Sequence, residues 1–97
     1  MYQGGTLDVG ITPSLKGDRG AYAAAHAPAY FVELRHAGHL AWANCGSDRT
    51  TETCLAGNAN ASLIVQYGVA FFDRHLKGLD EPLLGRQNSA LAEFDFK

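Results

Sequence analysis

The sequence has no excess of basic residues and no long apolar run. Its 8 Lys and Arg residues stand against 10 Asp and Glu residues, which gives a formal net charge of -2. Nucleic-acid binding needs a basic face and a membrane span needs about 20 consecutive apolar residues, so neither is expected. The opening decapeptide, MYQGGTLDVG, also lacks the basic start and apolar core of a secretory signal, although a signal could precede it.

What is present is an ordinary globular composition in a short chain. The 97 residues are 46% hydrophobic and 19% charged, which is too apolar for a disordered chain. This length suits one small domain or a piece of a larger one. Gly4 and Gly5 follow Met1 almost at once and leave few residues for a strand before them. We therefore expect a fragment or an internal methionine; the alternative is the frayed end of a complete small domain.

Residues 12–27 are predicted to be helical, with a break. Thr12 is a good N-cap and Pro13 suits the first helical position. Gly17 and Gly20 interrupt the pattern, and the stretch AYAAAHA that follows has strong helix propensity until a proline stops it.

A strand is predicted over residues 30–35, where apolar and other side chains alternate. Val32 and Leu34 fall on one face, while Glu33 and Arg35 fall on the other. Charges near the end of a strand are typical of a sheet edge, so we expect an edge strand here.

A second helix is predicted over residues 60–77, after a polar loop. Asn60 can cap its start, its apolar residues recur at spacings of three and four, and Gly78 can take the left-handed cap. The tail over 81–97 is predicted to be irregular as far as residues 90–96.

The order strand, helix, strand, loop and helix (βαβα) predicts an α/β fold with a parallel sheet. Two parallel strands cannot stand alone, because such strands are buried on both faces and need neighbours. Those neighbours are expected from sequence upstream of this chain or from another chain.

Asp8 and His39 follow the first and second predicted strands. The carboxyl ends of parallel strands meet at one edge of the sheet, where α/β proteins place their ligands. A carboxylate bound to an imidazole fixes its tautomer and leaves the other ring nitrogen to act as a general base. We therefore expect Asp8 and His39 to form an acid–base pair; the alternatives are a turn or capping aspartate and a polar loop histidine.

Three segments, GGTLDVGITP, PAYFVELRHAGHLAW and VAFFDRHLKG, resemble the C-terminal third of an α/β-hydrolase. The similarity covers residues 1–80 and is greatest to the dienelactone-hydrolase-like, platelet-activating-factor-acetylhydrolase-like and polyester-hydrolase-like esterases. It implies the last two strands and last two major helices of the hydrolase sheet, with Asp8 as the triad acid and His39 as its base. It also implies a small-molecule or polymeric ester substrate for the full-length protein, and no cofactor.

The sequence departs from that family because the nucleophile half is absent. No G-x-S-x-G occurs, and the early loop that supplies the oxyanion hole is missing. The chain alone is therefore expected to hydrolyse nothing. Two other functions stay open, a non-catalytic hydrolase fragment or interaction module and a small metal- or ligand-binding domain.

Cys45 and Cys54 bracket the loop after His39. A closure of this length suits a disulfide, worth about 3 kcal/mol in the chain-entropy model; the alternative is two free thiols in a cytosolic protein. The resembling secreted esterases carry C-terminal disulfides, which favours a secreted or periplasmic location. The spacing does not match the short cysteine and histidine pairs of structural zinc.

Trp42 and Leu40, close to His39, are candidates for the ester pocket, with core packing as the alternative for Trp42. We also expect several apolar side chains to face the missing part of the fold and to promote self-association of the isolated chain. These are Val32, Leu34, Ile64, Phe71 and Phe72.

Overall fold

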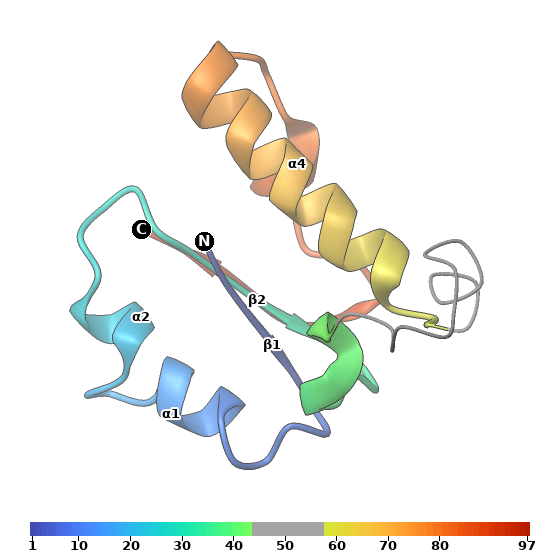
Figure 1. Ribbon diagram of the computed structural model, residues 1–97. Coiled ribbons are helices and arrows are strands. Elements are labelled where there is room, and N and C mark those ends of the chain that lie inside the picture. Colours follow the sequence, from blue (N-terminus) through green and yellow to red (C-terminus); the bar gives the residue numbers. More distant parts are fainter. Residues whose placement is uncertain (44–57) are drawn as a thin grey trace.

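The computed structural model describes residues 1–43 and 58–97, which form a small α/β domain around a three-stranded mixed sheet (Figure 1). The strands lie in the order β1-β2-β3, with β1 parallel and β3 antiparallel to β2. In Figure 1, α4 lies over one face of the sheet and the short helices α1 and α2 lie on the other side. The strands are β1 (Tyr2–Gly5), β2 (Tyr30–Leu34) and β3 (Leu91–Phe96).

The helix predicted over residues 12–27 is instead two short helices. They are α1 (Thr12–Lys16) and α2 (Ala21–Ala24), so the helical part of the AYAAAHA stretch ends at Ala24. A β-carbon on Gly20 would lie 2.4 Å from the carbonyl oxygens of Ser14 and Leu15. The chain therefore turns back on itself at this glycine, which ends one helix before the other begins.

Thr12 was predicted from its residue type to be the N-cap of the first helix, but it does not hold that position in α1. Ile11 holds that position, and Thr12 is the first helical residue. Its hydroxyl oxygen accepts a hydrogen bond from the Gly5 N–H at 2.9 Å. A contact seven residues away along the chain therefore replaces the local capping bond.

β2 is the central strand, so the prediction of an edge strand is wrong. The tail that was predicted to be mainly irregular supplies β3, which covers the side of β2 away from β1. Glu33 lies opposite Glu93 in the β2–β3 register. Its carboxylate is buried and paired with Lys16 at 2.7 Å, which explains how a charged side chain can occupy a central strand.

α4 (Ala61–Lys77) lies within the predicted bounds. Asn60 holds the N-cap position without a capping bond from its side chain, and Gly78 ends the helix with φ 70°, in the left-handed region. Within the described residues, no helix is long and apolar enough to cross a membrane.

The main core lies between α4 and the sheet. Val32, Leu34, Tyr67 and Leu91 are fully buried there, so Val32 and Leu34 do not form the open face that was predicted for them. They are covered because alternate residues of β2 point toward α4. Of the other residues predicted for that face, Ile64 and Phe71 are partly buried against this core, while Phe72 is exposed.

Candidate acid–base pair at the carboxyl end of the sheet

The chain segments after β1 and β2 stay joined beyond the ends of the strands. The Thr6 N–H donates to the Leu34 carbonyl at 3.1 Å, and the Leu7 N–H donates to the Ala37 carbonyl at 3.0 Å. The loop that carries Asp8 is therefore held directly against the segment that leads to His39.

Gly4 and Gly5 make this close approach possible. They belong to β1 itself, whereas a strand was expected only in the few residues before them. A β-carbon on Gly5 would lie 2.2 Å from the Ala37 carbonyl oxygen, and one on Gly4 would lie 2.8 Å from the Thr12 side chain. Glycine, which has no β-carbon, therefore fits beside Thr12 at position 4 and beside Ala37 at position 5.

Asp8 and His39 meet at this edge of the sheet, and the predicted contact between them is present. The Asp8 Oδ2 atom lies 2.9 Å from Nδ1 of His39. The other carboxylate oxygen, Oδ1, accepts a hydrogen bond from the Ile11 N–H at 3.3 Å. The Asp8 side chain is 10% exposed and that of His39 is 68% exposed, so the carboxylate is sheltered while the imidazole reaches outward.

Hydrogen bonding keeps Asp8 ionised. The bond from His39 lowers the pKa of the Asp8 carboxyl, the backbone N–H groups of Ile11 and Gly10 lower it further, and burial opposes them. A carboxylate that accepts several hydrogen bonds is favoured in its charged form. Asp8 is therefore a charged acceptor at neutral pH.

The contact also assigns roles to the two nitrogens of the His39 ring. Because Nδ1 faces a charged acceptor, it carries the proton, and the neutral ring is left with Nε2 as its basic nitrogen. His39 is the first residue of the single-turn helix η1 (His39–Trp42), and its side chain is largely exposed. This arrangement can accept a proton at Nε2 and stabilise the resulting imidazolium through Asp8.

The two predicted pocket residues lie in different surroundings. Leu40 is 77% exposed beside His39. Trp42 packs against the main core, and its Nε1 donates a hydrogen bond to Oε1 of Gln3 at 2.9 Å. The position of Trp42 favours the alternative of core packing.

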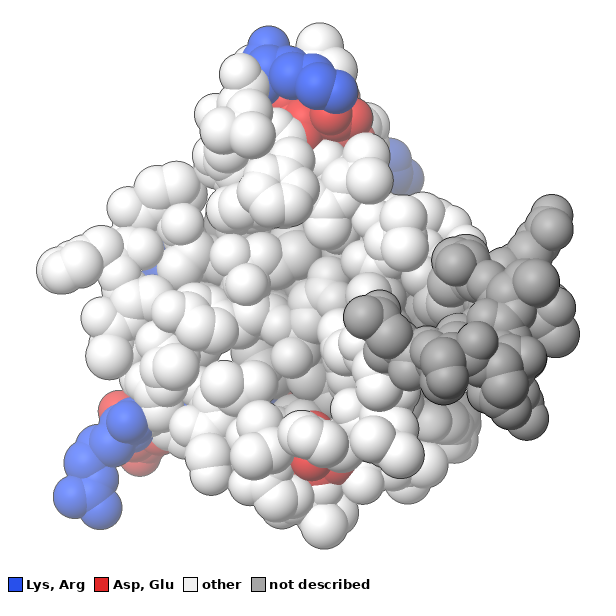
Figure 2. All heavy atoms as spheres, in the orientation of Figure 1, with Lys and Arg blue, Asp and Glu red and all other residues white. Residues whose placement is uncertain are grey.

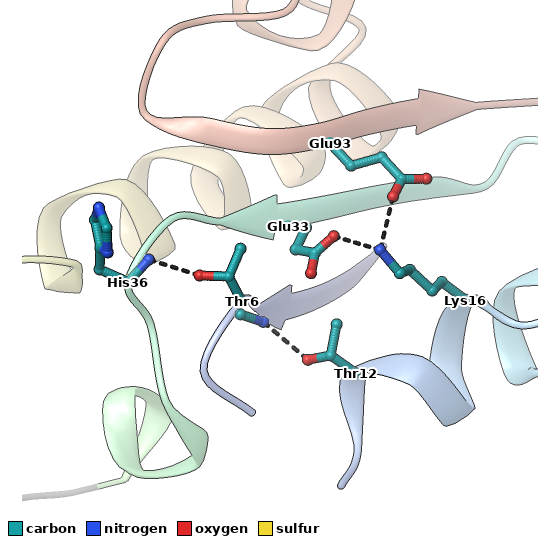
Figure 3. A network of polar contacts seen from close by, with 7 residues as sticks. Thr6, Thr12, Lys16, Glu33, His36 and Glu93 are labelled. Carbon is teal, nitrogen blue, oxygen red and sulfur yellow. Dashed lines mark hydrogen bonds and ion pairs between the residues drawn. The ribbon is translucent and has the colours of Figure 1, made fainter. Parts of the chain in front are cut away.

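Sequence reasoning missed the side-chain contacts that join these segments to one another and to the sheet. Thr6 accepts a hydrogen bond from the His36 N–H, and Lys16 bridges Glu33 and Glu93 (Figure 3). The local signal was a threonine on each side of Asp8, at positions 6 and 12. No sequence signal indicated the ion pairs, because 17 and 77 residues separate their partners.

The remaining candidates for chemistry do not join this pair. Cys45 and Cys54 lie outside the described residues. Ser14 donates to the Gly10 carbonyl and Ser62 accepts from Gln66, so both hydroxyls have local partners. Over residues 1–43 and 58–97, no three His, Cys, Asp or Glu side chains are grouped as metal ligands.

Comparison of the chain with protein-family models, with curated proteins and with solved structures finds no match.

Proposed function

We propose that this chain supplies the acid and the general base of a Ser-His-Asp triad in a carboxylic-ester hydrolase. Asp8 would be the acid and His39 the base, with the serine and the oxyanion hole contributed by sequence that precedes residue 1. The observation that carries the proposal is the 2.9 Å contact between Asp8 Oδ2 and His39 Nδ1 at the carboxyl end of two parallel strands.

In this reaction the Nε2 atom of His39 takes the proton of the serine hydroxyl as the oxygen attacks the ester carbonyl. The imidazolium then gives that proton to the departing alcohol, and an acyl-enzyme remains. A water molecule then attacks the acyl-enzyme and gives its proton to Nε2 of His39. The imidazolium returns that proton to the serine oxygen as the carboxylic acid leaves, which restores the serine. Asp8 holds the ring in the required tautomer and stabilises its positive charge, and the substrate is a small-molecule or polymeric ester.

The shape of the sheet supports a larger protein of this kind. Among the described strands β1 pairs with β2 alone, while β3 covers the opposite side of β2. The surface seen in Figure 2 is largely uncharged across its centre, and its charged side chains lie near the rim. An edge strand presents unpaired N–H and C=O groups, so the β1 edge is where further strands would pair.

The test uses the full product of the gene that encodes this chain, assayed on p-nitrophenyl esters. We expect hydrolysis, covalent labelling of one serine by a fluorophosphonate, and a loss of at least about 10⁴-fold in kcat/KM for His39→Ala. His26→Ala is the matched control, because His26 is exposed and lies beyond the end of α2.

An inactive, unlabelled gene product would contradict the proposal and favour a non-catalytic fragment or interaction module. Full activity in His39→Ala would contradict the assigned base even if the protein proved to be an esterase. The chain of residues 1–97 by itself is expected to give no turnover.

A further inference from the structure

We propose that Thr6 and Thr12 are positioning residues for the Asp8–His39 pair. Each threonine hydroxyl accepts a backbone hydrogen bond that fixes one side of the loop carrying Asp8. Their importance for catalysis rests on the proposed function, whereas their effect on the pair itself can be measured without any ester.

Thr12 closes the Asp8 loop onto β1. Its side chain is buried with the residue only 2% exposed, and its Oγ1 accepts the Gly5 N–H at 2.9 Å. Its own N–H donates to the Asp8 carbonyl at 3.1 Å. One residue therefore binds both the start of the loop and the backbone of the acid.

Thr6 joins the same loop to the turn that precedes His39. Its Oγ1 accepts the His36 N–H at 2.9 Å (Figure 3). His36 has φ 60°, in the left-handed region that residues with a β-carbon seldom adopt. Such a conformation costs energy and persists where its surroundings hold it, and the Thr6 hydroxyl is one of those holding contacts.

The two hydroxyls thus fix the two segments that carry the Asp8–His39 pair. Thr12 fixes Asp8 relative to the sheet, and Thr6 fixes the turn from which the chain reaches His39. A displacement of about 1 Å in a catalytic group can cost about 100-fold in rate. Loss of either acceptor should therefore loosen the 2.9 Å contact and slow catalysis.

The experiment compares Thr6→Val and Thr12→Val with Thr6→Ser and Thr12→Ser in the full gene product. Valine keeps the branched shape and removes the acceptor, while serine keeps the hydroxyl. The first readout is the low-field proton NMR signal of His39 Nδ1–H, assigned by its loss in Asp8→Ala. The second is the separation of kcat from KM in ester hydrolysis.

We expect the valine variants to lose or broaden this signal and to lower kcat about 100-fold with KM little changed, and we expect the serine variants to restore both. Thr6 is exposed, so Thr6→Val decides the question if Thr12→Val fails to fold. A wild-type signal and kcat in Thr6→Val would overturn the inference. Absence of hydrolysis in the wild-type protein would instead contradict the proposed function, and the NMR comparison would still test the threonines.

Discussion

Two histidines near opposite ends of β2 differ in what holds them. His39, beyond the end of the strand, binds a carboxylate and is 68% exposed. His75, in the last turn of α4, lies against the rings of Tyr30 and Phe71 with centroids 5.6 and 4.8 Å away. We call the surroundings of His39 the polar end and those of His75 the aromatic end.

The difference shows how one small sheet can hold one histidine by a directed hydrogen bond and another by aromatic packing. Hydrogen bonds at the polar end are directional, and each depends on one or two atoms. Contacts at the aromatic end are many and individually weak, so their sum depends on buried area and not on a single atom. Substitutions at the polar end should therefore alter the geometry of the Asp8–His39 pair, and substitutions at the aromatic end should alter the free energy of unfolding.

The largest effect on stability is expected from Tyr67→Ala. Tyr67 is fully buried and its ring packs beside Phe94, which lies next to Tyr30 of the aromatic end. Its hydroxyl accepts a hydrogen bond from Asn88 at 2.6 Å. Removing the ring should cost about 3–5 kcal/mol of the free energy of unfolding. Tyr67→Phe keeps the ring and should cost only about 1 kcal/mol. Urea unfolding of the gene product measures both, and equal losses would show that the ring packing is not what stabilises this end.

A smaller effect is expected from Lys16→Met, which breaks the link between α1 and the sheet. Glu33 is buried, while Lys16 and Glu93 are partly exposed. The buried carboxylate then lacks its cation, at a cost of about 1–3 kcal/mol after allowance for solvent screening. Adding Glu33→Gln should restore most of this loss in the same urea unfolding experiment, and a double variant as unstable as the single one would contradict the account.

The same link predicts a dependence of stability on alkaline pH. Hydrogen bonds to Glu33 and Glu93 raise the pKa of Lys16 above its usual 10.5. Its contribution is therefore fully present below that value and is lost as the pH rises through the raised pKa. Lys16→Met should remove this part of the alkaline loss, and unfolding curves at increasing pH would reveal it. An unchanged alkaline profile in Lys16→Met would assign the loss to other groups.

The smallest effect on stability is expected on the outer surface of α4. Phe72 and Leu76 are 56% and 78% exposed. Phe72→Gln combined with Leu76→Gln should change the free energy of unfolding by less than about 1 kcal/mol. It should also reduce self-association of the isolated chain, measured by sedimentation, because the variant removes exposed apolar surface. Undiminished association would show that the isolated chain associates through a surface other than this part of α4.

Local patterns in the sequence predicted the features that depend on neighbouring residues. The strand over 30–34, the bounds of α4 and the meeting of Asp8 with His39 all follow from periodicity and strand order. The tail was predicted to be mainly irregular and the position of β3 in the sheet was not predicted, because its pairing with β2 joins segments more than 50 residues apart. The hydrogen bond between Trp42 and Gln3 was not predicted for the same reason, since 39 residues separate its partners.

The most direct test of the central claim is the rate of ester hydrolysis by the full gene product with Asp8→Asn. Asparagine keeps the shape of the side chain but can donate its amide hydrogens to Nδ1, which favours the wrong tautomer of His39. We predict a fall of about 10⁴-fold in kcat with no comparable loss of folded protein. A wild-type kcat in Asp8→Asn would contradict the assignment of Asp8 and His39 as the acid and base of a triad.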